Sequence, residues 1–164
     1  MKKVLIPLVV LLGLLTASVT FAAEHSLNEA FRGIPWGTSK SELVSKYGLE
    51  KSQYIESDYK RADDNLSMGN IPVNYITYEV NSEGRFYRVT IEASLNHSGA
   101  LVQLYRQLLG PEATSSPKEY MWDVGKVRVW LEARPALHSA AQPYTKITIA
   151  RKSEEAMKNQ GGGL

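Results

Sequence analysis

The residues that most often bind metals or act as nucleophiles are scarce in this chain. It has no cysteine. It has three histidines: His25, His97 and His138. None of them has the H-x-x-x-H spacing that would place two metal ligands on one helix face. The sequence also has no G-x-S-x-G motif to mark a nucleophilic serine. We therefore predict no metal, no cofactor and no assigned catalytic residue.

Acidic residues form two groups that deserve comparison with known chemistry. One is the cluster Asp58, Asp63, Asp64 and Asn65. It lacks the alternating spacing and central glycine of a calcium-binding loop, and we interpret it as a charged loop. The other is Glu79 and Glu92, which alternation places on one face of a sheet. Paired carboxylates can act as acid and base in glycoside hydrolysis, although a solvated sheet face carries such pairs too.

Aromatic and arginine side chains on that same sheet face are the best candidates for a binding surface. The predicted face carries Tyr75, Thr77, Phe86, Arg88, Thr90, Arg128, Trp130 and Tyr144. Six of these are the candidate binding residues: Tyr75, Phe86, Arg88, Arg128, Trp130 and Tyr144. Aromatics and arginines dominate interface hot spots because they combine rigid area with directional donors. Two alternatives remain: cross-strand aromatic pairs also stabilise sheets without a ligand, and the 50–70 segment could cover the face.

The elements that would position these residues follow from hydrophobic period and turn chemistry. Ser39 and Glu42 fit a capping box, which predicts a short helix ending at Gly48. Ser98 is the expected cap of a second helix, which Gly110 ends. Alternation predicts strands at 71–80, 86–93, 120–124, 127–133 and 144–150, with a turn at 81–84. The 50–70 segment is a loop or an edge strand at 53–55. The fold class is therefore α+β, with short helices packed on one face of an antiparallel sheet.

The N-terminal segment suggests an exported protein. Lys2 and Lys3, an apolar stretch and the small residues before Ala23 have the layout of a cleavable signal peptide over 1–22. One α+β domain then spans 23–152, with halves at 31–95 and 96–152 that share an element order, and a tail spans 153–164. Cleavage removes two of the 19 basic residues and so balances the 17 acidic ones. We expect neither nucleic-acid binding nor stable membrane insertion after cleavage.

Residues 31–48 resemble a segment of known proteins. The letters FRGIPWGTS, followed by Glu42 and by Tyr47-Gly48, resemble small secreted bacterial proteins of uncharacterised function that open with GI-x-WG-x-S. The element order resembles the outer-membrane assembly lipoproteins and the tandem architecture of β-lactamase inhibitor protein. The chain lacks the lipoproteins' anchoring cysteine.

These likenesses imply a binding or assembly module. We therefore expect a periplasmic or secreted, non-catalytic module whose partner is another envelope or extracellular protein. One alternative is a small periplasmic hydrolase or ligand-binding enzyme. Another is an envelope accessory that docks through the turn at Trp36.

Overall fold

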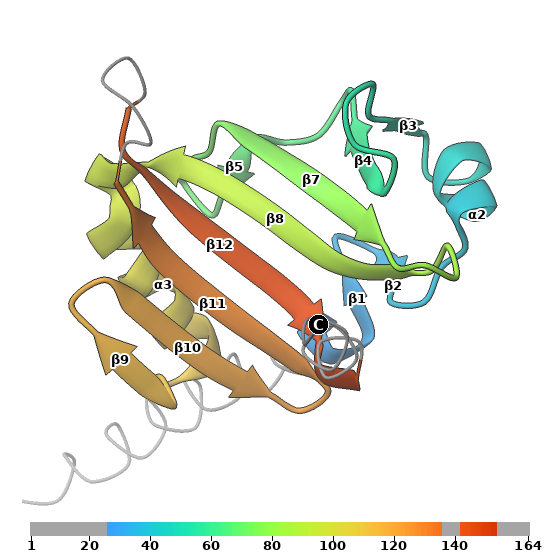
Figure 1. Cartoon of the computed structure of the whole chain (residues 1–164). Coiled ribbons are helices and arrows are strands. Elements are labelled where there is room, and N and C mark those ends of the chain that lie inside the picture. The colour runs from blue at the N-terminus through green and yellow to red at the C-terminus, as the bar shows by residue number, and fades with distance from the viewer. Residues whose placement is uncertain (1–25, 136–141, 154–164) are drawn as a thin grey trace, which may run out of the picture.

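The protein is built on one antiparallel sheet of eight strands, seen in the computed structural model of Figure 1. The structure describes residues 26–135 and 142–153. The strand order is β3-β4-β7-β8-β12-β11-β10-β9. The strands are β3 (Leu49–Lys51), β4 (Asp58–Arg61), β7 (Tyr75–Val80), β8 (Phe86–Ser94), β9 (Thr114–Ser116), β10 (Glu119–Val124), β11 (Val127–Arg134) and β12 (Tyr144–Arg151). The fold is α+β, as the alternating and helical periods predicted.

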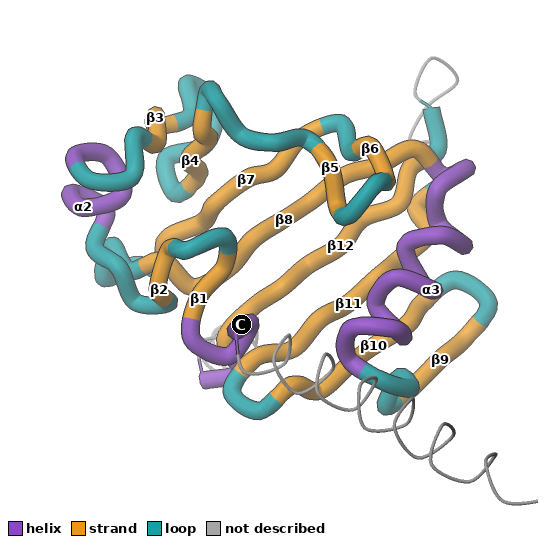
Figure 2. The backbone as a smooth tube through the Cα atoms, turned by 180° about the vertical axis from the view of Figure 1, so that it is seen from behind, coloured by secondary structure: helices purple, strands orange, loops and turns teal. Residues whose placement is uncertain are grey.

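One face of this sheet, here called the inner face, is covered. Helix α3 (Ser98–Leu109) and two small hairpins lie against it in Figure 2. The hairpins are β1 (Ala30–Phe31) with β2 (Ile34–Pro35), and β5 (Ser67–Met68) with β6 (Ile71–Pro72). The short helix α2 (Lys40–Ser45) packs beside β3 at one end of the sheet. The opposite face, the outer face, is turned toward the viewer in Figure 1.

The core lies between the inner face and these covering elements. Alternate residues of the two central strands β8 and β12 supply its middle: Val89, Ile91, Ile147 and Ile149 are at most 1% exposed. From α3, Leu101, Val102 and Tyr105 are buried against them. Burying an apolar side chain of this size contributes about 1.5–3 kcal/mol, so the alternation along the strands determines which face is covered.

The first hairpin shows why the turn around Trp36 forms. Arg32 and Gly33 are its two central residues, and both have positive φ, at 48° and 78°. A two-residue hairpin needs such angles, and glycine adopts them without strain. Trp36 then donates from Nε1 to the carbonyl of Leu27 at 2.8 Å and stacks on Phe86 with ring centroids 4.7 Å apart. These contacts place Trp36 at the edge of the core.

The two helix starts differ from each other. The capping box of α2 is confirmed, since Ser39 and Glu42 bond reciprocally to each other's backbone N–H. For α3 the prediction was wrong, because Ser98 is the first helical residue and makes no cap. A short 3₁₀ helix, η1 (Leu95–His97), precedes it, and Ser94 accepts a hydrogen bond from Asn96 N–H instead. The chain thus enters α3 already wound and needs no side-chain cap there.

The segment between α2 and β7 is more ordered than predicted. The expected edge strand at 53–55 is absent; β3 and β4 lie on either side of that segment and pair with each other. Tyr54 is 93% exposed, whereas Tyr59 in β4 is 5% exposed. Burial of Tyr59 against the core explains why the strand forms there.

Each half of the chain has a helix followed by four strands of the sheet. α2 precedes β3, β4, β7 and β8, and α3 precedes β9, β10, β11 and β12. The last strands of the two halves, β8 and β12, pair antiparallel at the centre of the sheet. The two predicted halves, 31–95 and 96–152, thus share this order of elements. The predicted signal peptide, the tail from residue 154 and most of the loop before β12 lie outside the described residues.

Candidate outer-face binding surface

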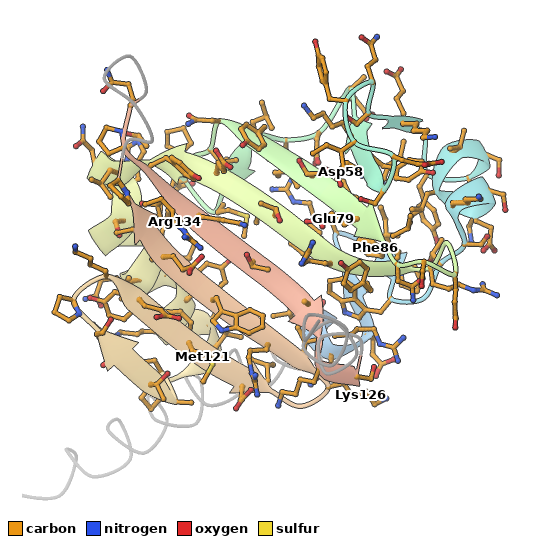
Figure 3. The ribbon with its side chains drawn as sticks, viewed as in Figure 1. Asp58, Glu79, Phe86, Met121, Lys126 and Arg134 are labelled. Atoms are coloured by element: carbon orange, nitrogen blue, oxygen red, sulfur yellow. The ribbon has the colours of Figure 1, made fainter. Side chains whose placement is uncertain are left out.

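Antiparallel register arranges the outer face in rows that cross the sheet. The first row is charged at both ends: Asp58, Glu79, Arg88, Ala150, Arg128 and Asp123. The second row has no charge: Thr77, Thr90, Thr148, Trp130 and Met121. The third row is mixed: Tyr75, Glu92, Lys146, Glu132 and Glu119. Figure 3 shows Glu79 near Asp58 toward the edge of the sheet formed by β3, and Met121 toward the opposite edge, formed by β9.

Glu79 is the most deeply placed charge on this face, at 7% exposed. Its Oε2 accepts from Arg88 Nε at 2.8 Å and also from a terminal nitrogen of the same guanidinium. Its Oε1 accepts from Thr90 Oγ1 at 2.7 Å. A buried carboxylate needs such donors, because removing it from water without them costs several kcal/mol. Arg88 and Glu79 therefore hold each other in one orientation.

Asp58 lies directly opposite Glu79 on the neighbouring strand. Its Oδ1 accepts a hydrogen bond from Ser57 Oγ at 3.0 Å. Burial raises the pKa of Asp58, and the charge of Glu79 acts in the same direction, although the Ser57 hydrogen bond opposes them. The two carboxyl groups thus have different surroundings: Glu79 has a guanidinium partner, whereas Asp58 has a hydroxyl and a like charge.

Arg128 occupies the other side of the first row. Its Nε donates to Asp123 Oδ1 at 2.8 Å, and its guanidinium carbon lies 5.5 Å from the ring centroid of Trp130. Lys152 Nζ reaches the same Asp123 oxygen at 3.2 Å. The Arg128 hydrogen bond, followed in importance by that of Lys152, lowers the pKa of Asp123. Trp130 is thereby flanked by a cation that a carboxylate holds in place.

The uncharged second row crosses the middle of the face. Thr77, Thr90 and Thr148 stand on three neighbouring strands, so their side chains lie about 5 Å apart. Trp130 and Met121 continue the row on β11 and β10, and both are partly exposed. The result is a strip of methyl groups, one indole and one thioether between two charged rows.

Tyr75 and Tyr144 lie toward one end of the face. Tyr75 is 37% exposed, and Lys60 Nζ lies 5.5 Å from its ring centroid. Burial, together with a hydrogen bond to Glu92, raises the pKa of Tyr75. Glu92 and Tyr144 also line a polar hollow of about 410 Å³ at this end. Both tyrosines therefore belong to the predicted surface.

Phe86 was wrongly predicted to lie on the outer face. It is fully buried, stacked on Trp36 and 5.9 Å from the ring of Tyr78. The register between β7 and β8 shifts at Glu79 and Val80, so that Val80 pairs with Phe86 while Glu79 pairs with Arg88. Tyr87 is the extra residue, and such a bulge breaks the period-two alternation. Of the six predicted binding residues, the other five are partly or well exposed: Tyr75, Arg88, Arg128, Trp130 and Tyr144.

Glu79 and Glu92 do lie on one face, but they do not form a carboxylate pair. Glu79 is opposite Arg88 and Glu92 is opposite Tyr75. Arg88 and Glu92 are four residues apart along β8, which is about 13 Å at the strand rise. The neighbour of Glu79 is Asp58, which sequence reasoning missed because β4 has no clear alternation among its charges.

The acidic cluster at 58–65 divides between two structural roles. Asp58 joins the outer face, whereas Asp64 binds Arg32 at 2.5 Å and accepts from the Tyr78 hydroxyl at 2.6 Å. The Arg32 contact ties the loop around Asp64 to the first hairpin, and the Tyr78 contact ties it to β7. His97 ends η1, and His25 and His138 lie outside the described residues. Within residues 26–135 and 142–153, no group of three or more potential ligands could hold a metal ion.

Comparisons with known proteins give no family for this chain. No protein-family model, no curated protein sequence and no solved structure matches it. In the part of the chain that the structure describes, no helix has the length and apolar character needed to cross a membrane.

Proposed function

We propose that this protein is an exported, non-catalytic module that binds another envelope or extracellular protein through the outer face. One observation carries the proposal. The helix α3 and the two small hairpins lie on the inner face, and in Figures 1 and 2 no described helix or hairpin lies over β10, β11 and β12 on the outer face.

The chemistry of the rows fits a protein partner. The second row supplies an uncharged strip with Trp130 and Met121, residue types enriched at interface cores. Arg88 and Arg128 flank that strip, and each is held by a carboxylate, Glu79 and Asp123 respectively. Because these arginines are already oriented, they lose less side-chain entropy when a partner binds them.

The charges of the face argue against a polyanionic partner. In and beside the first row, Arg88, Arg128 and Lys152 are matched by three carboxylates: Asp58, Glu79 and Asp123. Nucleic-acid binding depends on an excess of Lys and Arg that neutralises phosphates. The first row is balanced and the third row has three glutamates against Lys146, so the two charged rows together have no excess of positive charge.

The geometry gives less support to the two alternatives. A hydrolase that uses Glu79 and Glu92 would need the two carboxylates close together, yet they lie in the first and third rows of the outer face. Glu79 is also hydrogen-bonded to Arg88 and Thr90. Docking through Trp36 would need a free indole. The indole of Trp36 instead stacks on Phe86 and donates to a backbone carbonyl.

Site-specific photocrosslinking in cells tests the proposal. We expect p-benzoylphenylalanine at the centre of the face, in place of Thr148, to give one discrete adduct with another protein. The same residue in place of Gln103, which is exposed on α3 and lies on the other side of the sheet, serves as the matched control. Adding Trp130→Ala to the Thr148 variant should abolish the adduct, because it removes the largest side chain of the uncharged strip.

Two results would contradict the proposal. One is the absence of any discrete adduct at Thr148 in a folded, exported protein. The other is the same adduct at both Thr148 and Gln103, because contact on both sides of the sheet would show no preference for the outer face. Phe86 is unsuitable for such tests, since its substitution would disturb the core.

A further inference from the structure

A hollow lies at the end of the sheet that carries α2, next to residues of the charged first row. Its volume is about 860 Å³, within the range of roughly 300–1,000 Å³ typical of ligand pockets. Four segments form it: the 55–59 stretch leading into β4, the turn between β7 and β8, Lys40 of α2 and Lys51 of β3. The hollow therefore lies between segments that are distant in sequence.

The inside of the hollow is apolar and its rim is polar. Tyr59, Val80 and Tyr87 line it and are each at most 7% exposed, so they belong to its floor. Ile55 also lines it but is 54% exposed, which leaves an aliphatic wall open to water. Hydroxyl and amide groups from the turn and from Ser57 surround this floor.

The charges around the hollow are balanced. Lys40 and Lys51 are matched by Glu56 and Glu83, and Lys51 Nζ lies 3.5 Å from Glu56 Oε1. No single sign of charge predominates, so the lining does not select a strongly charged small molecule. A neutral group with hydrogen-bonding ends and an apolar body matches it better.

Two residues of the hollow, Ser57 and Tyr87, contact residues of the charged first row. Ser57, in its lining, donates to Asp58, and Asp58 stands opposite Glu79. Tyr87, in its floor, lies under the guanidinium of Arg88, whose carbon is 5.1 Å from the ring centroid.

We propose that the hollow receives one apolar side chain of the protein that binds the outer face. A leucine or phenylalanine would contact Tyr59, Val80 and Ile55, and the flanking backbone amides of the partner would bond to the serine hydroxyls of the rim. Burying one large side chain in a preformed pocket is how a protein interface concentrates its binding energy. This inference rests on the proposed function, because it names where that partner is anchored.

Capped amino acids test the hollow without the partner. N-acetyl-leucine amide and N-acetyl-phenylalanine amide are the probes, and N-acetyl-glutamine amide is the polar comparison. We expect the two apolar probes to shift the NMR signals of Ser57, Ser82 and Gly84 saturably. Their dissociation constants should be on the order of millimolar, as for ligands of about a dozen heavy atoms. The glutamine probe should shift these signals far less.

Three variants test whether the probes bind inside the hollow. Ile55→Asn should weaken the apolar probes about tenfold by removing the aliphatic wall. Leu66→Asn, the same type of change at a residue of similar exposure that does not line the hollow, should leave their affinity unchanged. Ser82→Trp should block binding by filling the hollow from its exposed rim. Each variant's folding is checked by its circular dichroism and NMR dispersion.

The inference is overturned if the apolar probes leave Ser57, Ser82 and Gly84 unshifted. It is equally overturned if Ser82→Trp leaves their affinity unchanged, or if Ile55→Asn and Leu66→Asn weaken binding equally. Binding of the probes together with a lack of crosslinking at Thr148 would instead contradict the proposed function alone. Crosslinking at Thr148 without probe binding would support the outer face as the binding surface and contradict the proposal that the hollow anchors the partner.

Discussion

Single residues on the outer face owe their properties to neighbours on other strands. Glu79 is buried with Arg88 and Thr90 as partners, while Asp58, directly across from it, has a raised pKa because of burial and the nearby like charge. The two carboxyl groups face the same solvent, yet only one has a guanidinium. This difference follows from the register of β4, β7 and β8.

The pKa of Asp58 makes a testable prediction about stability. Because the pKa in the folded state lies above the ordinary value of 3.8, the folded state binds the proton more tightly than the unfolded state. The contribution of Asp58 to the free energy of unfolding therefore falls as the pH rises through and above this value. Asp58→Asn removes the effect, so its stability relative to the wild type should increase from pH 4 to pH 7.

Urea unfolding of both proteins at several pH values measures this difference. Asp63→Asn is the control, because Asp63 is an exposed residue of the same segment. It should show no comparable trend. A relative stability of Asp58→Asn that is constant with pH, or that decreases toward pH 7, would contradict the assignment.

At the scale of elements, a β-bulge decides which face one aromatic residue occupies. Alternation along 86–93 places Phe86 with Arg88, but the shift in pairing at Glu79 and Val80 directs Phe86 into the core beside Trp36. A bulge of this kind inserts one residue into one strand only. Composition alone does not reveal it, since Phe86 and Tyr87 are both aromatic and both buried.

Alanine substitutions distinguish these two aromatic positions. Phe86→Ala should lower the free energy of unfolding by about 3–5 kcal/mol, because it leaves a cavity against Trp36 and Tyr78. Trp130→Ala, on the outer face, should cost only about 1 kcal/mol, since its side chain is already partly in water. Chemical denaturation measures both. Equal losses would place Trp130 in the core and remove it from the binding surface.

At the scale of the whole molecule, the two halves share one sheet and one core. β8 and β12 pair along seven residue positions at its centre, and their inward side chains form the middle of the core. Neither half could keep that core dry alone, because each would expose a central strand edge. We therefore expect residues 31–95 and 96–152 to unfold together.

Tryptophan fluorescence can report on each half separately. One variant keeps Trp36 and replaces Trp122 and Trp130 with phenylalanine; a second variant keeps Trp122 and replaces the other two. For each variant, fluorescence and circular dichroism should give the same urea midpoint and slope, as in two-state unfolding. A fluorescence transition that is separate from the circular dichroism transition would instead show two independently folding units.

Much of the fold could be predicted from local patterns. Ser39 and Glu42 identify the start of α2 because a capping box needs only residues three apart. The hairpin of β7 and β8 and the pair β10 and β11 follow from alternation and turn residues. Five of the six predicted surface residues also lie on the outer face, because a regular strand places every second residue on one side.

The remainder depended on pairing between distant segments. The sequence by itself determined the α+β class, the covered face and the residues that alternate away from it, since these follow from backbone geometry and side-chain polarity. Only the tertiary structure placed Asp58 beside Glu79, turned Phe86 inward and formed the hollow at Tyr59 and Tyr87. Strand order, register and a single inserted residue decide these contacts, and none of the three is a local property of the chain.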